Sequence, residues 1–220
     1  MKAAAAIITI TTTMTDASVL LRLLTWLSPA FPTGGFAYSH GLEWAVEAGD
    51  VRDEASLQCW LADVIAHGTG RNDVILLRHA RRGAHVIDLA RAISPSLERR
   101  RETAFLGEAF AAAAAPWGTI DPAPYPVAVG CLGARNAVDE DDLAAAYLHA
   151  FTSSLVSAAV RLIPLGQQAG LRVLAALAPV ILETAEKARV ATLDDLGGAC
   201  FRSDIAAMRH ETQYTRLFRS

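Results

Sequence analysis

The sequence predicts an all-α protein, a single-domain bundle of about eight to ten helices. Three observations favour this class. Apolar residues recur at i, i+3, i+4 and i+7 in one segment after another, which is the period of an amphipathic helix. Prolines and glycines gather between these segments, and residues that can cap a helix stand at several of their starts. No sustained alternation of apolar and polar residues, flanked by turn residues, indicates a strand.

The first helix is expected to begin after Asp16, a suitable N-cap, and to carry an apolar stripe from Val19 to Leu27. Residues 1–15 precede it and are expected to form a flexible tail, because their threonine cluster has no helical period. The stretch Ser28–Gly35 (SPAFPTGG) must be a loop, since two prolines and two glycines disfavour regular structure. A short helix follows through Glu47.

The middle of the chain alternates between helices and breaks. Asp53 can cap a helix whose apolar positions run from Leu57 to Ile65. Another helix is predicted to place Leu76, Ala80, Ala84, Ile87 and Ala90 on one face and arginines on the other. The triplet Ser94-Pro95-Ser96 then breaks the chain, and a helix is expected from Leu97 to about Ala115.

Four prolines between 116 and 126 predict an extended connection before a helix over 127–135. The acidic residues 139–142 suit the N-terminus of the next helix, where the helix dipole favours negative charge. That helix carries a large apolar stripe from Leu143 to Leu162. Ala146, Ala150, Ser153 and Ser157 form a small-residue face that would let another helix approach closely. Two more helices are predicted, one with Leu171, Leu174, Ala178, Leu182 and Ala185 on its apolar face and one over residues 194–209.

Composition excludes several classes of protein. A net charge of −3 implies no general affinity for polyanions, so the sequence predicts no nucleic-acid partner. Three cysteines far apart (Cys59, Cys131, Cys200) form no disulfide framework or zinc motif and fit the cytoplasm. The uncharged runs Ala109–Ile120 and Val173–Leu182 are shorter than the roughly 20 residues of a spanning helix, so no membrane span is expected.

No motif predicts an active site. The loop Pro32–Gly35 precedes a helix but lacks the lysine-containing form of a phosphate-binding loop. His40 and Glu43 are spaced i, i+3 and could reach one metal ion, although no third ligand is visible nearby. We therefore predict neither a catalytic residue nor a metal site. A metal-dependent hydrolase built on His40 and Glu43 remains an alternative, as does a peripheral membrane protein that uses an apolar helix face.

The C-terminal segment, residues 208–220 (MRHETQYTRLFRS), is unusual for a chain end. It combines three arginines with Tyr214, Leu217 and Phe218, and arginine and tyrosine are residues that interfaces favour. Chain ends are usually frayed, but a frayed end rarely needs these three side chains together. The segment is therefore predicted to dock a partner.

Four segments together resemble the urease accessory protein UreF family. They are Leu23–Glu43 (LLTWLSPAFPTGGFAYSHGLE), Tyr125–Ala134 (YPVAVGCLGA), Arg161–Gly170 (RLIPLGQQAG) and Ile205–Ser220 (IAAMRHETQYTRLFRS). The last two are the most specific, because long strings of polar and aromatic residues rarely recur by chance. The resemblance runs from about residue 18 to the last residue.

The resemblance implies a non-enzymatic, all-helical chaperone for urease maturation. Such a protein would bridge a UreD/UreH-like protein and a UreG-like GTPase, and would support GTP-dependent nickel insertion into apo-urease. Nickel and GTP would be handled by the partners, the chain itself needing no cofactor, and a homodimer is expected. The resemblance places partner binding in two patches, one formed by Gly34, Gly35, Tyr38, His40 and Glu43, the other by Tyr214, Arg216, Phe218 and Arg219.

Overall fold

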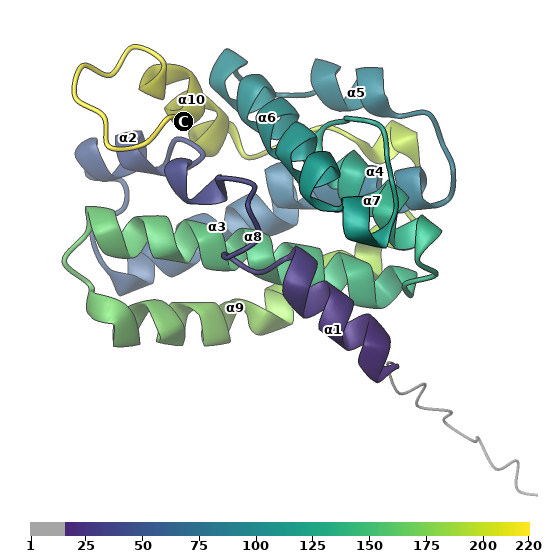
Figure 1. Ribbon diagram of the computed structural model, residues 1–220. Coiled ribbons are helices and arrows are strands. Elements are labelled where there is room, and N and C mark those ends of the chain that lie inside the picture. The colour runs from purple at the N-terminus through teal and green to yellow at the C-terminus, as the bar shows by residue number, and fades with distance from the viewer. Residues whose placement is uncertain (1–15) are drawn as a thin grey trace, which may run out of the picture.

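The computed structural model describes residues 16–220, and within them every regular element is a helix (Figure 1), which confirms the predicted class. The flexible tail predicted for residues 1–15 lies outside the described residues. The elements are α1 (Ala17–Trp26), η1 (Gly35–Ala37), α2 (Leu42–Glu47), α3 (Glu54–His67), α4 (Thr69–Arg81), α5 (Ile87–Ala92), α6 (Leu97–Ala113), η2 (Ala115–Trp117), α7 (Tyr125–Arg135), α8 (Glu140–Leu162), α9 (Gly166–Ala188), η3 (Leu193–Asp195) and α10 (Phe201–His210), where η denotes a 3-10 helix.

Helix α4 lies between two apolar clusters and is buried on both sides. Val74 and Ile75 pack with α3, α8 and α9 in one cluster, whereas Leu76 and Leu77 pack with α1, α6 and α7 in the other. Helix α7 comes close to α4 at Gly130, where an added Cβ would stand 2.4 Å from the Leu77 carbonyl oxygen. The bundle is thus built around α4 and the long α8.

Predicted helix starts agree with the observed caps. The Asp16 side chain accepts the Ser18 N–H, and Asp53 forms a capping box with Ser56. Asp139 accepts the N–H groups of Asp141 and Asp142 at the start of α8. These side chains satisfy N–H groups that have no partner inside the helix.

Two expectations about helices are wrong. The single helix predicted to reach Ala90 is two helices, because the chain turns at Gly83, whose φ is +90°. In α9 the face with Leu171 and Leu182 is exposed (66% and 61%), and Val173, Leu177 and Ile181 are buried instead. In the middle of α9, apolar residues occur on every side of the helix, so the sequence does not indicate which side faces the core. Three members of the small-residue face of α8, Ala150, Ser153 and Ser157, line a cavity described below, and the fourth, Ala146, packs against the second apolar cluster.

Arg78 differs from the solvated arginine expected on α4. Its side chain is 1% exposed and bonds Glu140 at 2.7 Å and Asp141 at 2.8 Å. Both terminal nitrogens of its guanidinium are paired, which compensates much of the cost of burying the charge. Arg78 therefore fastens α4 to the N-terminus of α8.

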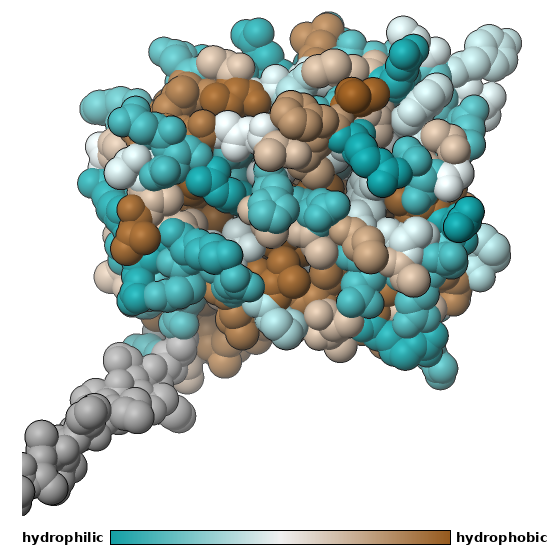
Figure 2. Space-filling view, turned by 180° about the vertical axis from the view of Figure 1, so that it is seen from behind, coloured by the Kyte–Doolittle hydropathy of each residue, from teal (hydrophilic) through white to brown (hydrophobic). Residues whose placement is uncertain are grey.

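By length and composition alone, α8 and α9 could each cross a membrane, which corrects the expectation that no segment is long enough. In the bundle, 56% of the most apolar stretch of α8 and 39% of that of α9 is buried. Seen from behind, apolar residues are mostly interspersed with polar ones and gather most in the lower middle of the view (Figure 2). Burial against neighbouring helices accounts for the apolar character of α8.

Candidate functional site

Glycines allow the loop between α1 and α2 to adopt its backbone conformation. Gly34, at the entry of η1, and Gly41, before α2, both have φ of +76°, a region that glycine reaches without a steric cost. Gly41 also lies against α10, because an added Cβ would stand 2.5 Å from the backbone nitrogen of Ala207. The glycine thus allows α2 and α10 to pack closely.

The last ten residues, 211–220, which we call the C-terminal tail, fold back onto this loop (Figure 1). The Ser220 carbonyl oxygen accepts the Ser39 N–H at 2.7 Å and the Ser39 hydroxyl at 2.5 Å. The Arg219 N–H donates to the Ala37 carbonyl at 2.8 Å. Main-chain bonds therefore join the end of the described chain to its first loop.

Glu43 anchors the middle of the tail. Its carboxylate accepts the Leu217 N–H at 2.6 Å and the Phe218 N–H at 2.9 Å. One of its oxygens also lies 3.2 Å from His210 Nε2. Because Glu43 is 7% exposed, its charge is compensated by these donors and not by water.

Glu98 on α6 supplies a second anchor. One carboxylate oxygen lies 2.7 Å from His210 Nδ1, and the other accepts the Arg216 guanidinium at 2.6 Å. The neighbouring Gln213 side chain donates to Glu47. Glu211 instead caps α6 by accepting the Leu97 N–H at 2.7 Å. Helices α2, α6 and α10 thus all hold the tail.

Glu102 on α6 binds the last residue of the tail. Its carboxylate accepts the Ser220 hydroxyl, lies 2.7 Å from His40 Nε2 and pairs with Arg99. Burial alone would raise the pKa of Glu102, but the charge of Arg99 and the contacts with His40 outweigh it and lower the pKa to about 2. Burial, aided by Arg99, lowers the pKa of His40. We call Ala37, Ser39, Glu43, Glu98 and Glu102 the tail seat.

Phe218 is the apolar anchor of the tail. It is 4% exposed and packs with the cluster around α3, α8 and α9. The Arg161 guanidinium lies over its ring, 4.3 Å from the centroid, and also donates to the Phe36 carbonyl. A cation over an aromatic face is stabilising, so Arg161 links α8 to both the loop and the tail.

Other tail residues point outward. Tyr214 is fully exposed and Leu217 is 64% exposed, and the side chains of Arg216 and Arg219 are also exposed. Next to them runs an open groove of about 500 Å³ between the tail and α6, with Arg101 and Phe105 on its α6 side. Tyr38 also lines this groove and is 9% exposed.

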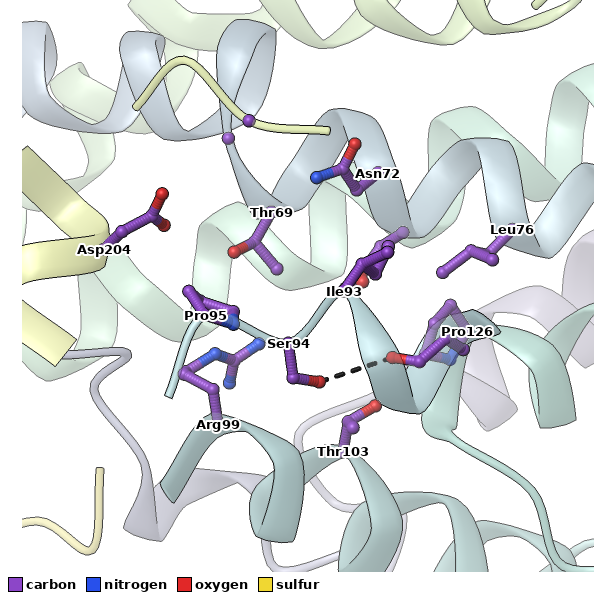
Figure 3. Close-up of a pocket in the computed structure, with 14 residues that line it drawn as sticks. Thr69, Asn72, Leu76, Ile93, Ser94, Pro95, Arg99, Thr103, Pro126 and Asp204 are labelled. Atoms are coloured by element: carbon purple, nitrogen blue, oxygen red, sulfur yellow. Dashed lines mark hydrogen bonds between the residues drawn. The ribbon is translucent and has the colours of Figure 1, made fainter. Parts of the chain in front are cut away.

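Two cavities lie deeper. A cavity of about 140 Å³ between α6, α8 and the first loop is lined by Tyr38, His40 and Glu102 and reaches Asp73. A smaller cavity of about 60 Å³ lies beyond Asp73, Arg99 and Thr103, which line both (Figure 3). Figure 3 shows side chains from α4, α6 and α10 around it, with the Ser94 hydroxyl donating to the Ala90 carbonyl at 3.3 Å.

Asp73 is the most perturbed acid of these cavities. Burial raises its pKa to about 6, although it accepts the Tyr147 hydroxyl at 2.8 Å and lies near Arg99. Burial and the charge of Asp73 raise the pKa of Tyr125 and Tyr147 far above the usual range. Asp73, Tyr125 and Tyr147 thus give the cavities polar lining, but they do not form a pair of nucleophile and general base.

The two patches named from the sequence form one region. Tyr38 lines a groove with Phe218 and Arg219, and Glu43 accepts the Phe218 N–H. His40 reaches the tail only through Glu102, which binds Ser220, and Gly34 and Gly35 lie in the adjoining turn. Their exposure differs, however. Glu43 and Phe218 are buried and hold the tail, whereas Tyr214, Arg216 and Arg219 face solvent.

Sequence reasoning missed several residues of this region. Glu98, Arg99 and Glu102 lie in a charged stretch of α6 that reads as a solvated face. His210 was not named as a site residue, and it is completely buried between two carboxylates. The signal that could have found them is the density of charged residues at i, i+3 and i+4 spacing on a helix that must still bury one side.

The proposed pairing of His40 and Glu43 on one metal ion has no geometric support. His40 faces Glu102 and Arg99, whereas Glu43 faces the tail and His210. Within residues 16–220, no group of three or more His, Cys, Asp or Glu side chains is arranged to hold a metal ion.

Comparison with known proteins places the chain among urease accessory proteins. The family profile named UreF matches residues 51–178. A urease accessory protein UreF of Cereibacter sphaeroides strain KD131 is 54% identical over 208 residues, covering 92% of this chain and 99% of the relative. One from Bradyrhizobium sp. strain BTAi1 is 52% identical over 224 residues, covering 93% of each. One from Methylobacterium sp. strain 4-46 is 50% identical over 220 residues, covering 91% of this chain and 88% of the relative.

Proposed function

Because the chain belongs to the UreF family of urease accessory proteins, we propose that it is a scaffold that joins two other accessory proteins during urease maturation. As a member of this family it is a urease accessory protein and not an enzyme. The bridging role, the identity of the partners and the residues that contact them are our proposal.

The docked tail is the observation that carries the proposal. Ordering ten residues at a chain end costs conformational entropy, and here the tail seat compensates that cost with buried, charge-assisted hydrogen bonds. The result is a fixed display of Tyr214, Leu217 and Arg219 on the surface. Exposed apolar and arginine side chains held in one place are typical of an interface.

The UreD/UreH-like partner is assigned to the outward side of the tail and to α10. Phe201, Ile205 and Met208 stand one helical turn or so apart on the outer side of α10 and are 68%, 54% and 51% exposed. Large apolar side chains on three successive turns form a strip that another protein can cover. The tail begins directly after this helix.

The UreG-like GTPase is assigned to the groove beside Tyr38 and Arg219. Both residues line it, together with Arg101 and Arg216. Glu98, which also lines the groove, pairs with Arg216. Arg101 and Arg219 with the aromatic ring of Tyr38 suit a partner surface that carries carboxylates. In this assignment nickel and GTP stay with the partners, and the chain works in the cytoplasm on apo-urease, as a homodimer.

Co-purification with each partner tests the proposal. The variant Tyr214→Ala/Leu217→Ala should lose capture of the UreD-like protein, whereas Val190→Ala, which changes an 82% exposed apolar residue elsewhere, should not. Arg219→Ala should weaken capture of the GTPase. The thermal unfolding midpoint should change little in all three variants, because these side chains are exposed. Undiminished capture by the tail variants at equal protein stability would overturn the assignment.

A further inference from the structure

The larger of the two cavities, which we call the inner pocket, has the form of a ligand site. Pro29, Phe36 and Ser154 line it with exposed side chains, so it opens to the surface. Arg99 and Glu102 also line it and are 6% and 1% exposed, so its inner end is polar and buried. Its volume of about 140 Å³ is roughly ten times the space that one water molecule needs. Pockets with a few polar groups at the inner end are typical sites for small ligands.

Two buried nitrogen atoms of the pocket lining have no hydrogen-bond partner among residues 16–220. They are Nε of Arg99 and Nδ1 of His40. Arg99 uses Nη1 for Glu102 and His40, which leaves its Nε–H as a donor without an acceptor. The backbone of His40 has φ of +58°, a strained conformation for a residue with a side chain, and such strain gathers at ligand sites. Since buried polar atoms are nearly always hydrogen-bonded, both atoms indicate a polar group inside the pocket.

The charges of the pocket disfavour an ionic ligand. Arg99 and Glu102 form an ion pair, so their charges compensate each other. Asp73 accepts the Tyr147 hydroxyl at 2.8 Å, and its carboxylate can accept further hydrogen bonds. A cation would lie near the Arg99 guanidinium and leave its Nε–H without an acceptor. An anion would face the carboxylates of Asp73 and Glu102. The lining therefore fits a neutral group that has both an acceptor and N–H donors.

Aromatic rings give the pocket walls that suit a flat ligand. Tyr125, Tyr147 and Phe151 line it, and the rings of the two tyrosines are 5.6 Å apart between centroids. Planar polar groups stack on such faces. A carboxamide is planar and neutral, with one carbonyl acceptor and two N–H donors. We propose that the inner pocket binds a carboxamide group, whose carbonyl accepts the Arg99 Nε–H and whose N–H donates to Asp73.

A carboxamide can reach the pocket from two sources. One is an asparagine or glutamine side chain of a partner, inserted past Phe36 at the exposed rim; this source rests on the proposed function. The other is a free small amide from solution, which needs no partner. The recognition chemistry is the same for both, so binding of the group can be measured on the isolated chain and its source by partner capture.

Titration of ¹⁵N-labelled full-length protein with acetamide tests the site. Proton–nitrogen correlation spectra at neutral pH should show saturable shifts of the backbone amides of Asp73, Arg99 and their neighbours. Acetate and methylammonium are matched probes of similar size that carry a negative and a positive charge. Each should bind about tenfold more weakly or worse than acetamide, because each leaves one of the two polar groups without a partner.

Variants locate the binding in the pocket. Ser153→Phe fills the pocket from α8 without removing a charged group and should abolish the acetamide shifts. His149→Phe, at an exposed position of the same helix outside the lining, should bind as wild type. Arg99→Lys keeps the positive charge beside Glu102 but lacks the Nε–H, and it should weaken acetamide binding about tenfold. The thermal midpoint of each variant shows that it is folded, and Ser153→Phe carries the test if Arg99→Lys is not.

Three results would overturn the inference: tighter binding of acetate or methylammonium than of acetamide, acetamide shifts that persist in Ser153→Phe, or no saturable shift with any probe, as expected of a pocket that holds only water. Given acetamide binding, partner capture by Ser153→Phe identifies the source. Lost capture at an unchanged thermal midpoint assigns the carboxamide to a partner, and full capture assigns it to a free amide. Failure of the proposed function, seen as undiminished capture by the tail variants, would leave the acetamide result intact.

Discussion

The carboxylate of Glu43 accepts the backbone N–H of Phe218 at 2.9 Å, across 175 residues of sequence. This one contact joins helix α2 to the last residues of the chain and makes the two sequence patches a single structural unit. The same carboxylate also binds the Leu217 N–H. Changes at Glu43 therefore report on the whole tail seat.

Replacing Glu43 with alanine should destabilise the protein by about 2–4 kcal/mol, because two backbone donors and a buried histidine lose their acceptor at once. Urea unfolding followed by circular dichroism measures this loss. Glu183→Ala, at an exposed surface ion pair with Lys187, should leave stability nearly unchanged, because solvent screens such a pair. Similar values for the two variants would contradict the anchoring role.

Two glycines with the same backbone angle should respond differently to alanine. Gly41 (φ +76°) has backbone atoms of Ala207 in the place of a Cβ, whereas Gly49 (φ +78°) has open space there. Gly49→Ala should cost about 1–2 kcal/mol from the left-handed backbone alone. Gly41→Ala should cost clearly more, because α2 and α10 must move apart. Equal shifts of the thermal midpoint would show that α2 and α10 are not packed this closely.

Asp73 should lower stability at neutral pH. Its pKa is raised to about 6 by burial, so the folded state holds the proton more strongly than the unfolded state and stability falls as pH rises from about 4 to 6. Asp73→Asn should raise the thermal midpoint at pH 7.5 and leave it nearly unchanged at pH 4. Asp63→Asn, at an exposed residue, serves as the control. A loss of stability at pH 7.5 would mean that the ionised form is needed.

Glu102 should have the opposite effect. Its pKa is lowered to about 2 in the folded state, so its contribution is present above the ordinary carboxyl range and is lost as pH falls toward 2. Glu102→Gln should therefore destabilise the protein at pH 7 and reduce the steepness of acid unfolding. Glu108→Gln, at an exposed position on the same helix, should do neither. An unchanged acid transition in Glu102→Gln would place the acid sensitivity in other groups.

Local signals in the sequence predicted the helices well, because caps and breakers act within a few residues. Asp16 and Asp53 begin helices as expected, and the loop Ser28–Gly35 holds no α-helix. The break at Gly83 was missed because apolar residues continue in helical register on both sides of it. The exposed face of α9 was misjudged because its apolar residues surround most of the helix.

The candidate site was only half predictable. Side chains such as Tyr38 and Arg219 could be named, but their exposure depends on contacts between distant segments. Glu43 looked available at the surface and is buried under the tail, while His210 looked unremarkable and lies between two carboxylates. Long-range pairing of charged residues leaves no periodic signature in one sequence, so neither position could be derived from spacing.

The central claim is that the tail is docked on the seat in the partner-free protein. Amide hydrogen exchange of Phe218 at neutral pH tests it most directly, because this N–H donates to buried Glu43. The account predicts slow exchange in the isolated wild-type chain and fast exchange in Glu43→Ala, with core amides protected in both. Exchange of Phe218 at the rate of an unstructured peptide, in a wild-type chain whose core remains protected, would contradict it.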